Sequence, residues 1–90
     1  MPTNHTKLRQ LQNTEASIIT YNVYSNGYKI VKEALVLGIE ELAGNIKFSR
    51  IFIRDILLYD ELGHPVLDAD DGGYVYLGDV KSIRTVGTGE

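Results

Sequence analysis

A chain of 90 residues with no cysteine and a formal net charge of −3 at pH 7 excludes a disulfide framework, a thiolate metal site and a general positive field for binding nucleic acid. Hydrophobic residues make up 43% of the sequence, which predicts one folded domain rather than a disordered chain. A domain of this size is marginally stable alone, so we expect a homo-oligomer. The first residues lack the apolar core of a signal peptide, and no run approaches the roughly 20 apolar residues that span a bilayer. We therefore expect a cytoplasmic protein without membrane contact.

Residues 3–13 have the pattern of a short amino-terminal helix. Thr3 or Asn4 can cap its start, Leu8 and Leu11 share one side, and Asn13 can end it. A helix of about two to three turns is not stable alone in water. We therefore expect the two leucines to pack on the open end of a small β-barrel.

The next segment, from Ser17 to Leu37, predicts a β-hairpin with Asn26-Gly27 at its tip. A two-residue type I′ turn needs positive φ at both central residues, which Asn tolerates and Gly accepts freely. This turn also sets the register, because cross-strand partners keep a constant index sum. The expected pairs are Ser25 with Tyr28, Val23 with Ile30, Tyr21 with Lys32 and Ile19 with Ala34. One face of the hairpin is then apolar except for Lys32, whose stem can lie over Tyr21.

Residues 28–43 leave an alternative open, because their apolar side chains also fit helical spacing, with Gly44-Asn45 suited to a helix end. We favour a strand through Leu37, since the turn demands a strand partner. Gly38 then serves as a bend or bulge that switches faces. The segment from Ile39 to Gly44 becomes a loop or a single helical turn.

The remaining sequence predicts further strands separated by tight turns. Ile46 to Asp60 is a long β-like run that is apolar on both parities, as in strands that curve within small barrels. The turns expected after it are Asp60–His64, the acidic Asp68–Gly73 and Gly78-Asp79, and the strands between and after them are Pro65–Leu67, Tyr74–Leu77 and Val80–Val86.

This order of a short helix and about five strands resembles the Sm/LSm family. The family's first motif passes through a glycine hairpin tip and a bent second strand to Gly-x-Asp-x-x-x-Asn, which is similar to Asn26-Gly27 followed by Gly38-Ile-Glu-Glu-Leu-Ala-Gly-Asn45. Its second motif, a strand ending in Arg-Gly before a last apolar strand, is similar to Tyr74-Val-Tyr-Leu-Gly-Asp-Val-Lys-Ser-Ile83. The resemblance covers roughly residues 17–86. It implies a mainly β fold, with a helix and arm at 1–15, a five-stranded, strongly bent antiparallel Sm-like (SH3-like) open barrel at 16–86, and a loose tail at 87–90.

In Sm proteins a loop Asn and Asp fix a uracil, while an Arg and an aromatic side chain stack on it. Here Glu40 stands where the family has Asp, and one extra residue separates it from Asn45. Leu42 lies near the usual stacking position, and Leu77 replaces the arginine. The resemblance implies a nucleic-acid site on the loop from residue 40 to 45 and on the turn at 78–79. Its residues are Glu40, Leu42, Asn45, Lys47, Gly78, Asp79 and Lys81.

Within this site the Asn45 amide can read a base edge, and Lys47 or Lys81 could meet a phosphate. The carboxylates of Glu40 and Asp79 repel phosphates, so we expect weak, salt-sensitive binding of RNA or single-stranded DNA. An open barrel leaves two strand edges unpaired, and the last strands carry no proline and few charges. Edge pairing between subunits then predicts a ring of about five to seven copies. The alternative is a structural assembly module, for example of a phage or mobile element, without nucleic-acid binding.

Other candidate motifs favour ordinary structural roles. Asp68, Asp70, Gly73 and Asp79 match part of a calcium-loop template, but the flanks are strand-like, which favours a solvated acidic turn. His5 and His64 lie far apart and favour exposed positions. No nucleophile–base set or glycine-rich phosphate loop stands out, so we expect no enzyme, no cofactor and no metal. The strand tyrosines could stack on bases or fill an interface, although plain packing is the commoner role; they are Tyr21, Tyr24, Tyr28, Tyr74 and Tyr76.

Overall fold

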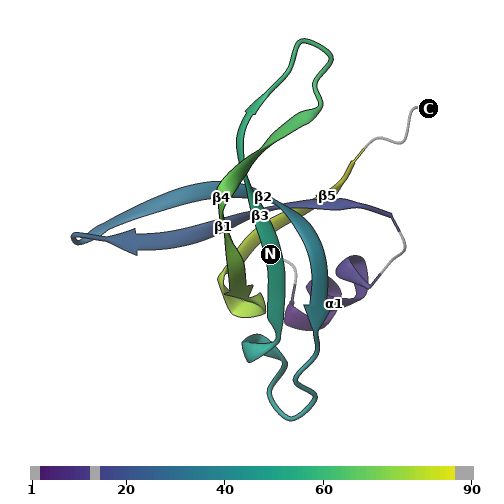
Figure 1. Cartoon of the computed structure of the whole chain (residues 1–90). Helices are drawn as coiled ribbons and strands as arrows, with labels where there is room; N and C mark the ends of the chain where they lie inside the picture. The colour runs from purple at the N-terminus through teal and green to yellow at the C-terminus, as the bar shows by residue number, and fades with distance from the viewer. Residues whose placement is uncertain (1–2, 13–14, 87–90) are drawn as a thin grey trace.

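The computed structural model describes residues 3–12 and 15–86 and confirms the mainly β fold class. A short helix precedes five antiparallel strands, which form one strongly bent sheet that is not closed (Figure 1). The elements are α1 (Asn4–Leu11), β1 (Ser17–Ser25), β2 (Tyr28–Glu40), β3 (Arg50–Tyr59), β4 (Pro65–Tyr76) and β5 (Val80–Thr85), with 3-10 turns η1 (Ile46–Phe48) and η2 (Leu77–Asp79). The strand order β4-β3-β2-β1-β5 leaves β4 and β5 as the two edges.

The β1–β2 hairpin has the predicted turn and register. Asn26 and Gly27 both have positive φ, 52° and 82°, as a type I′ turn requires. All four predicted cross-strand pairs are present. The predicted apolar face is buried only near the barrel, because the hairpin tip projects beyond it (Figure 1), and Ile30 is 47% exposed.

The segment after this turn is a strand and not a helix, and it runs three residues past Leu37 to Glu40. The predicted bulge is present at Gly38. Val36 pairs with Ile53 and Gly38 with Phe52, so Leu37 has no partner on β3. An extra residue of this kind bends the strand and increases its twist, which lets β2 curve round the core.

The predicted strand start at Ile46 is wrong, because residues 46–48 form η1 and β3 begins at Arg50. The Asn45 carbonyl accepts from the amide of Phe48 at 3.0 Å, and the Ile46 carbonyl accepts from Ser49 at 2.9 Å. These bonds within the turn take the backbone groups that a strand would have paired across the sheet.

The predicted turn over residues 68–73 is also wrong, since β4 continues through it from Pro65 to Tyr76. Arg54 pairs with Gly72 and Ile56 with Leu67, so four residues of β4 oppose one residue of β3. The Arg54 guanidinium donates to the Ala69 carbonyl at 2.8 Å, and the Asp68 carboxylate accepts from the amide of Asp70 at 2.9 Å. The acidic segment 68–71 is therefore a large bulge within an edge strand; we call it the acidic bulge.

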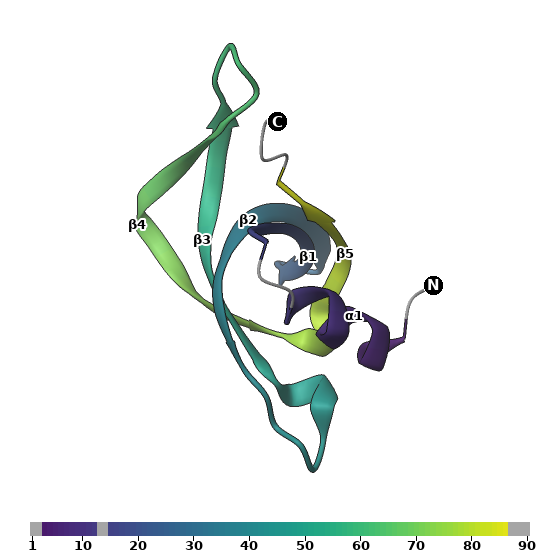
Figure 2. The same cartoon turned by 90° about the vertical axis from the view of Figure 1, so that its right-hand side faces the viewer.

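Helix α1 covers one end of the curled sheet, where β1, β2 and β5 wrap round a common centre (Figure 2). Thr3 caps the helix by accepting from the amide of Thr6, and Leu8 and Leu11 are buried, as predicted. The predicted stop residue Asn13 and the tail at 87–90 lie outside the described residues. The buried apolar core consists of Leu8, Leu11, Ile19, Tyr21, Ala34, Ile51, Ile53, Leu77 and Val80.

Among residues 3–12 and 15–86, no helix has the length and apolar character needed to cross a membrane.

Candidate nucleic-acid interface

The two segments predicted to share a site, the loop after β2 and the turn before β5, lie against each other. The amide of Leu77 in η2 donates to the carbonyl of Ser49 at 2.9 Å. The buried Ser49 hydroxyl accepts from the amide of Leu42 at 2.9 Å, which fixes the loop. Gly78 packs so closely that a Cβ there would lie 3.3 Å from the carbonyl oxygen of Lys47. The predicted proximity of these segments is therefore present.

Beside this junction, four aromatic side chains form one continuous exposed patch across η1, β3 and β4. Phe52 pairs with Tyr74 across the two strands, with ring centroids 6.2 Å apart. Tyr74 and Tyr76 project from the same face of β4 at 5.5 Å, and Phe48 meets Tyr76 edge-on at 5.6 Å. All four side chains are exposed. We call Phe48, Phe52, Tyr74 and Tyr76 the aromatic patch.

Arg50 lies among these rings. Its guanidinium carbon is 5.7 Å from the centre of the Phe52 ring and 5.4 Å from that of Tyr74. The same guanidinium forms an ion pair with the exposed Glu40 carboxylate, and this hydrogen bond raises the pKa of Arg50. The patch therefore carries a fixed cation whose charge is balanced by a neighbouring acid.

Two neighbouring cavities share the rings of Phe48 and Tyr76. The larger has a volume of about 390 Å³, with Glu40, Glu41, Leu42, Phe48, Arg50, Tyr74 and Tyr76 as its lining. The smaller has a volume of about 260 Å³, with Lys47, Phe48, Tyr76, Gly78 and Asp79 as its lining. The larger is within the size range of small-ligand sites. We call the larger one the arginine cavity.

Five of the seven predicted site residues thus line these two cavities: Glu40, Leu42, Lys47, Gly78 and Asp79. Asn45 lies in the adjoining loop, where its backbone caps η1 and its side chain makes no capping bond. Lys81 lies on β5 and lines neither cavity. The structure therefore brings six of the residues to one region and leaves Lys81 outside it.

Sequence reasoning missed Phe48, Arg50 and Phe52 as members of the site, and mentioned Tyr74 and Tyr76 only as general stacking candidates. A signal is nevertheless present. Alternate residues of a strand share a face, so Arg50 and Phe52 on β3 match Tyr76 and Tyr74 on β4 once the register is known.

Tyr76 of the patch is neutral at physiological pH. A hydrogen bond with Tyr74 is the largest cause that raises the pKa of Tyr76, and its Coulombic interaction with Tyr74 acts in the same direction. Neutral rings can stack on nucleobases of any kind, while Arg50 and Lys47 supply positive charge. The carboxylates of Glu40, Glu41 and Asp79 surround that charge, so the site has little net attraction for a phosphate chain.

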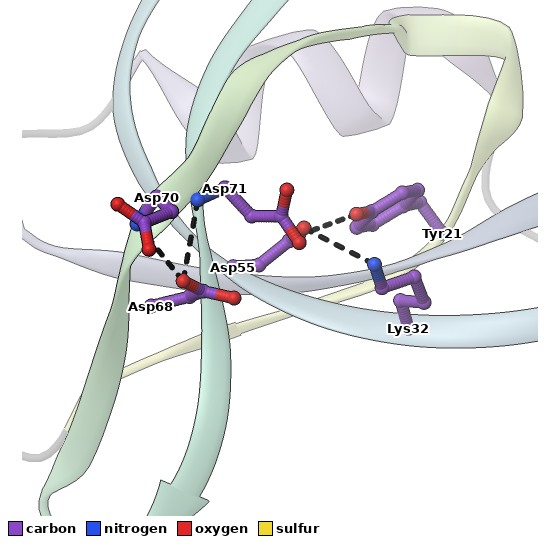
Figure 3. Close-up of polar contacts among 6 residues, drawn as sticks. All are labelled: Tyr21, Lys32, Asp55, Asp68, Asp70 and Asp71. Atoms are coloured by element: carbon purple, nitrogen blue, oxygen red, sulfur yellow. Dashed lines mark hydrogen bonds and ion pairs between the residues drawn. The ribbon is translucent and has the colours of Figure 1, made fainter.

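A second polar cluster, also missed, lies inside the curled sheet and beside the acidic bulge (Figure 3). Asp55 of β3 is 8% exposed; its carboxylate accepts from the Tyr21 hydroxyl and from the Lys32 ammonium, the latter at 3.2 Å. Burial, followed by the bond to Asp55, raises the pKa of Tyr21. In the bulge, the Asp68 carboxylate is occupied by backbone amides, which lower its pKa. Among the described residues, no three His, Cys, Asp or Glu side chains gather in a metal-binding arrangement.

Comparisons of the chain with models of protein families, with curated proteins and with solved structures give no match.

Proposed function

We propose that the chain is a ring-forming Sm-like protein that binds RNA or single-stranded DNA weakly through the aromatic patch. The observation that carries this proposal is the exposed row of four rings around Arg50, next to the loop and turn in which the resemblance places the site. Aromatic surface exposed to water is costly, so aromatic side chains that served only packing would normally be covered by the rest of the domain.

The chemistry of the patch favours unpaired bases over duplexes. Each exposed ring can stack on one base, and such stacking is worth about 1–3 kcal/mol per base. A duplex offers mainly its phosphate backbone, which the neighbouring carboxylates repel. Binding through bases with little help from phosphates is weak, and it requires a single strand.

Ring formation is supported by the two open edges of the sheet. β4 and β5 each have one neighbour, and β5 carries no proline along its length. Joining β4 of one subunit to β5 of the next would pair these edges and repeat the same contact round a closed ring. Because Tyr74 and Tyr76 belong to β4, each aromatic patch would then lie beside the neighbouring subunit and line one continuous surface.

Titration of fluorescently labelled oligouridine and oligoadenine at low salt, followed by anisotropy, tests the proposal. We expect measurable binding that weakens as salt is added, and a loss of about tenfold for Tyr74→Ala. The matched control is Tyr24→Ala, which removes an exposed tyrosine of the β1–β2 hairpin. Asn45→Ala should also weaken binding if its amide reads a base. Absence of binding at low salt, or equal losses for Tyr74→Ala and Tyr24→Ala, would refute the proposal.

A second candidate, a structural assembly module, is favoured by the β3–β4 hairpin. This hairpin projects from the barrel (Figure 1), and Leu62 at its tip is 80% exposed. The neighbouring exposed apolar side chains are Leu57, Leu58, Val66 and Leu67. Apolar surface of this extent commonly marks a protein contact. Nucleic acid that copurifies with the protein, detected from the ratio of absorbance at the base and protein maxima, would favour the leading proposal over this one.

A further inference from the structure

We infer that the arginine cavity is a base pocket selective for guanine. The inference rests on the proposed function, since it names the base that the aromatic patch would take from a single strand. It is derived from the hydrogen-bonding groups of Glu40, Glu41 and Arg50, which line the cavity together with the rings that would hold the base plane.

The two glutamates supply acceptors only, because ionised carboxylates have no proton to donate. One oxygen of Glu40 accepts both bonds from Arg50, and one oxygen of Glu41 accepts at 3.1 Å from Gln12, the residue that follows α1. Within residues 3–12 and 15–86, no hydrogen bond reaches the second oxygen of either side chain. The lining of the cavity therefore carries two carboxylate oxygens without a hydrogen-bond partner in the described part of the chain, on adjacent residues where β2 ends.

Arg50 supplies donors beside these acceptors. Its Nε and one terminal nitrogen are engaged by Glu40, which fixes the plane of the guanidinium. The other terminal nitrogen, Nη1, donates to no group in the described part of the chain. A carboxylate partner orients the remaining donors of an arginine, and guanine, through O6 and N7, is the base that arginine contacts most often.

The pattern offered by the cavity is thus one donor next to two acceptors. Guanine alone presents the complement on its pairing edge: an O6 acceptor followed by the N1–H and N2–H donors. Adenine and cytosine place a ring-nitrogen acceptor next to their amino group, and uracil places carbonyls on both sides of its N–H. Each of these bases would set at least one lone pair against a carboxylate, which is repulsive and leaves that acceptor unpaired.

The carboxylates that weaken phosphate binding therefore acquire a role in base selection. A pocket that stacked every base equally would bind a strand more tightly if its charged side chains were all basic, because these attract phosphates. Here Glu40 and Glu41 reduce attraction for the backbone and act as acceptors for the one base with two adjacent donors.

Single-position substitution in a labelled oligouridine tests the inference. One strand carries a single guanosine, a second carries inosine, which lacks only the N2 amino group, and a third carries adenosine. We expect the guanosine strand to bind about tenfold more tightly than the inosine strand, because a charge-assisted hydrogen bond is lost. Glu41→Gln should reduce this ratio without abolishing binding to the all-uridine strand. Glu61→Gln, in the exposed β3–β4 turn, is the matched control and should leave the ratio unchanged.

The outcomes separate the two claims. Equal binding of the guanosine, inosine and adenosine strands would overturn guanine selectivity while leaving the proposed nucleic-acid function in place. A guanosine preference that survives Glu41→Gln and Glu40→Gln would also overturn it, because the acceptors would not carry the selection. Failure of every strand to bind at low salt would overturn both.

Discussion

Tyr21 and Asp55 belong to strands that are not neighbours in the sheet, yet the hydroxyl of Tyr21 donates a hydrogen bond to the carboxylate of Asp55 in the interior (Figure 3). β2 separates the two strands, so the contact exists only because the sheet curls on itself. Lys32 on β2 completes the group by meeting the other carboxylate oxygen. The hydrogen bond between Tyr21 and Asp55 therefore depends on the curvature of the barrel as well as on local packing.

Replacing Tyr21 by Phe should lower the free energy of unfolding by about 1–3 kcal/mol, because a buried carboxylate would lose one of its two side-chain partners. Urea denaturation followed by circular dichroism measures the change. Tyr24→Phe is the control, since Tyr24 is 70% exposed. Equal stability of Tyr21→Phe and wild type would mean that the hydrogen bond contributes nothing to the fold.

Alkaline pH should destabilise the protein through the same tyrosine. Burial and the bond to Asp55 raise the pKa of Tyr21 above the ordinary tyrosine value of about 10, so the unfolded chain loses this proton at lower pH than the folded chain. The contribution is fully present below pH of about 10 and is lost as the pH rises towards the folded pKa. From a pH of about 10 up to the folded pKa, the free energy of unfolding should fall more steeply with pH for wild type than for Tyr21→Phe. Parallel slopes for the two proteins would contradict this assignment.

Gly27→Val should destabilise the domain by more than about 1 kcal/mol, since a β-branched residue is strained at a φ of 82°. The reason is conformational, because no atom beyond Gly27 and its two chain neighbours lies within 4 Å of an added Cβ. Gly44→Val is the control: its surroundings are equally open and its φ is not positive. Thermal melting compares the variants, and an unchanged midpoint for Gly27→Val would argue against strain at this turn.

Ring assembly predicts a discrete oligomer of about five to seven copies at micromolar concentration. Sedimentation velocity over a range of protein concentrations measures it, and native mass spectrometry counts the subunits. A closed ring should give one species whose mass stops increasing with concentration, because every edge is paired. A monomer at micromolar concentration would remove the ring from the proposal.

Local turn chemistry was the part of the fold that could be predicted most accurately. Asn26-Gly27 determines a turn type, and the turn type determines the pairing of Tyr21 with Lys32. The predicted strand start at Ile46 was wrong because the apolar composition of residues 46–48 fits either a strand or a short turn that packs on η2. The choice between them depends on bonds such as Leu77 to Ser49, which join residues far apart in sequence.

The turn predicted over residues 68–73 was wrong for a related reason. Asp and Gly favour turns, yet residues 68–71 remain within β4, where Arg54 on the partner strand donates to the carbonyls of Asp68 and Ala69. The aromatic patch could be found only in part, since its members come from two strands whose register was unknown. Asp55 could not be assigned at all, because the partner that explains its burial, Tyr21, lies across an intervening strand.

The acidic bulge also limits which strands can pair with the free edge of β4. Amyloid-like stacking needs a long, flat and uncharged strand whose backbone groups are offered in unbroken sequence. In β4 the four-residue bulge interrupts that sequence, and the like charges of Asp68, Asp70 and Asp71 would face those of any identical strand laid against it. The usable edge is confined to the few residues that end at Tyr76. A chain with an open sheet and exposed apolar hairpins is in this way protected from fibril growth along its longest free strand.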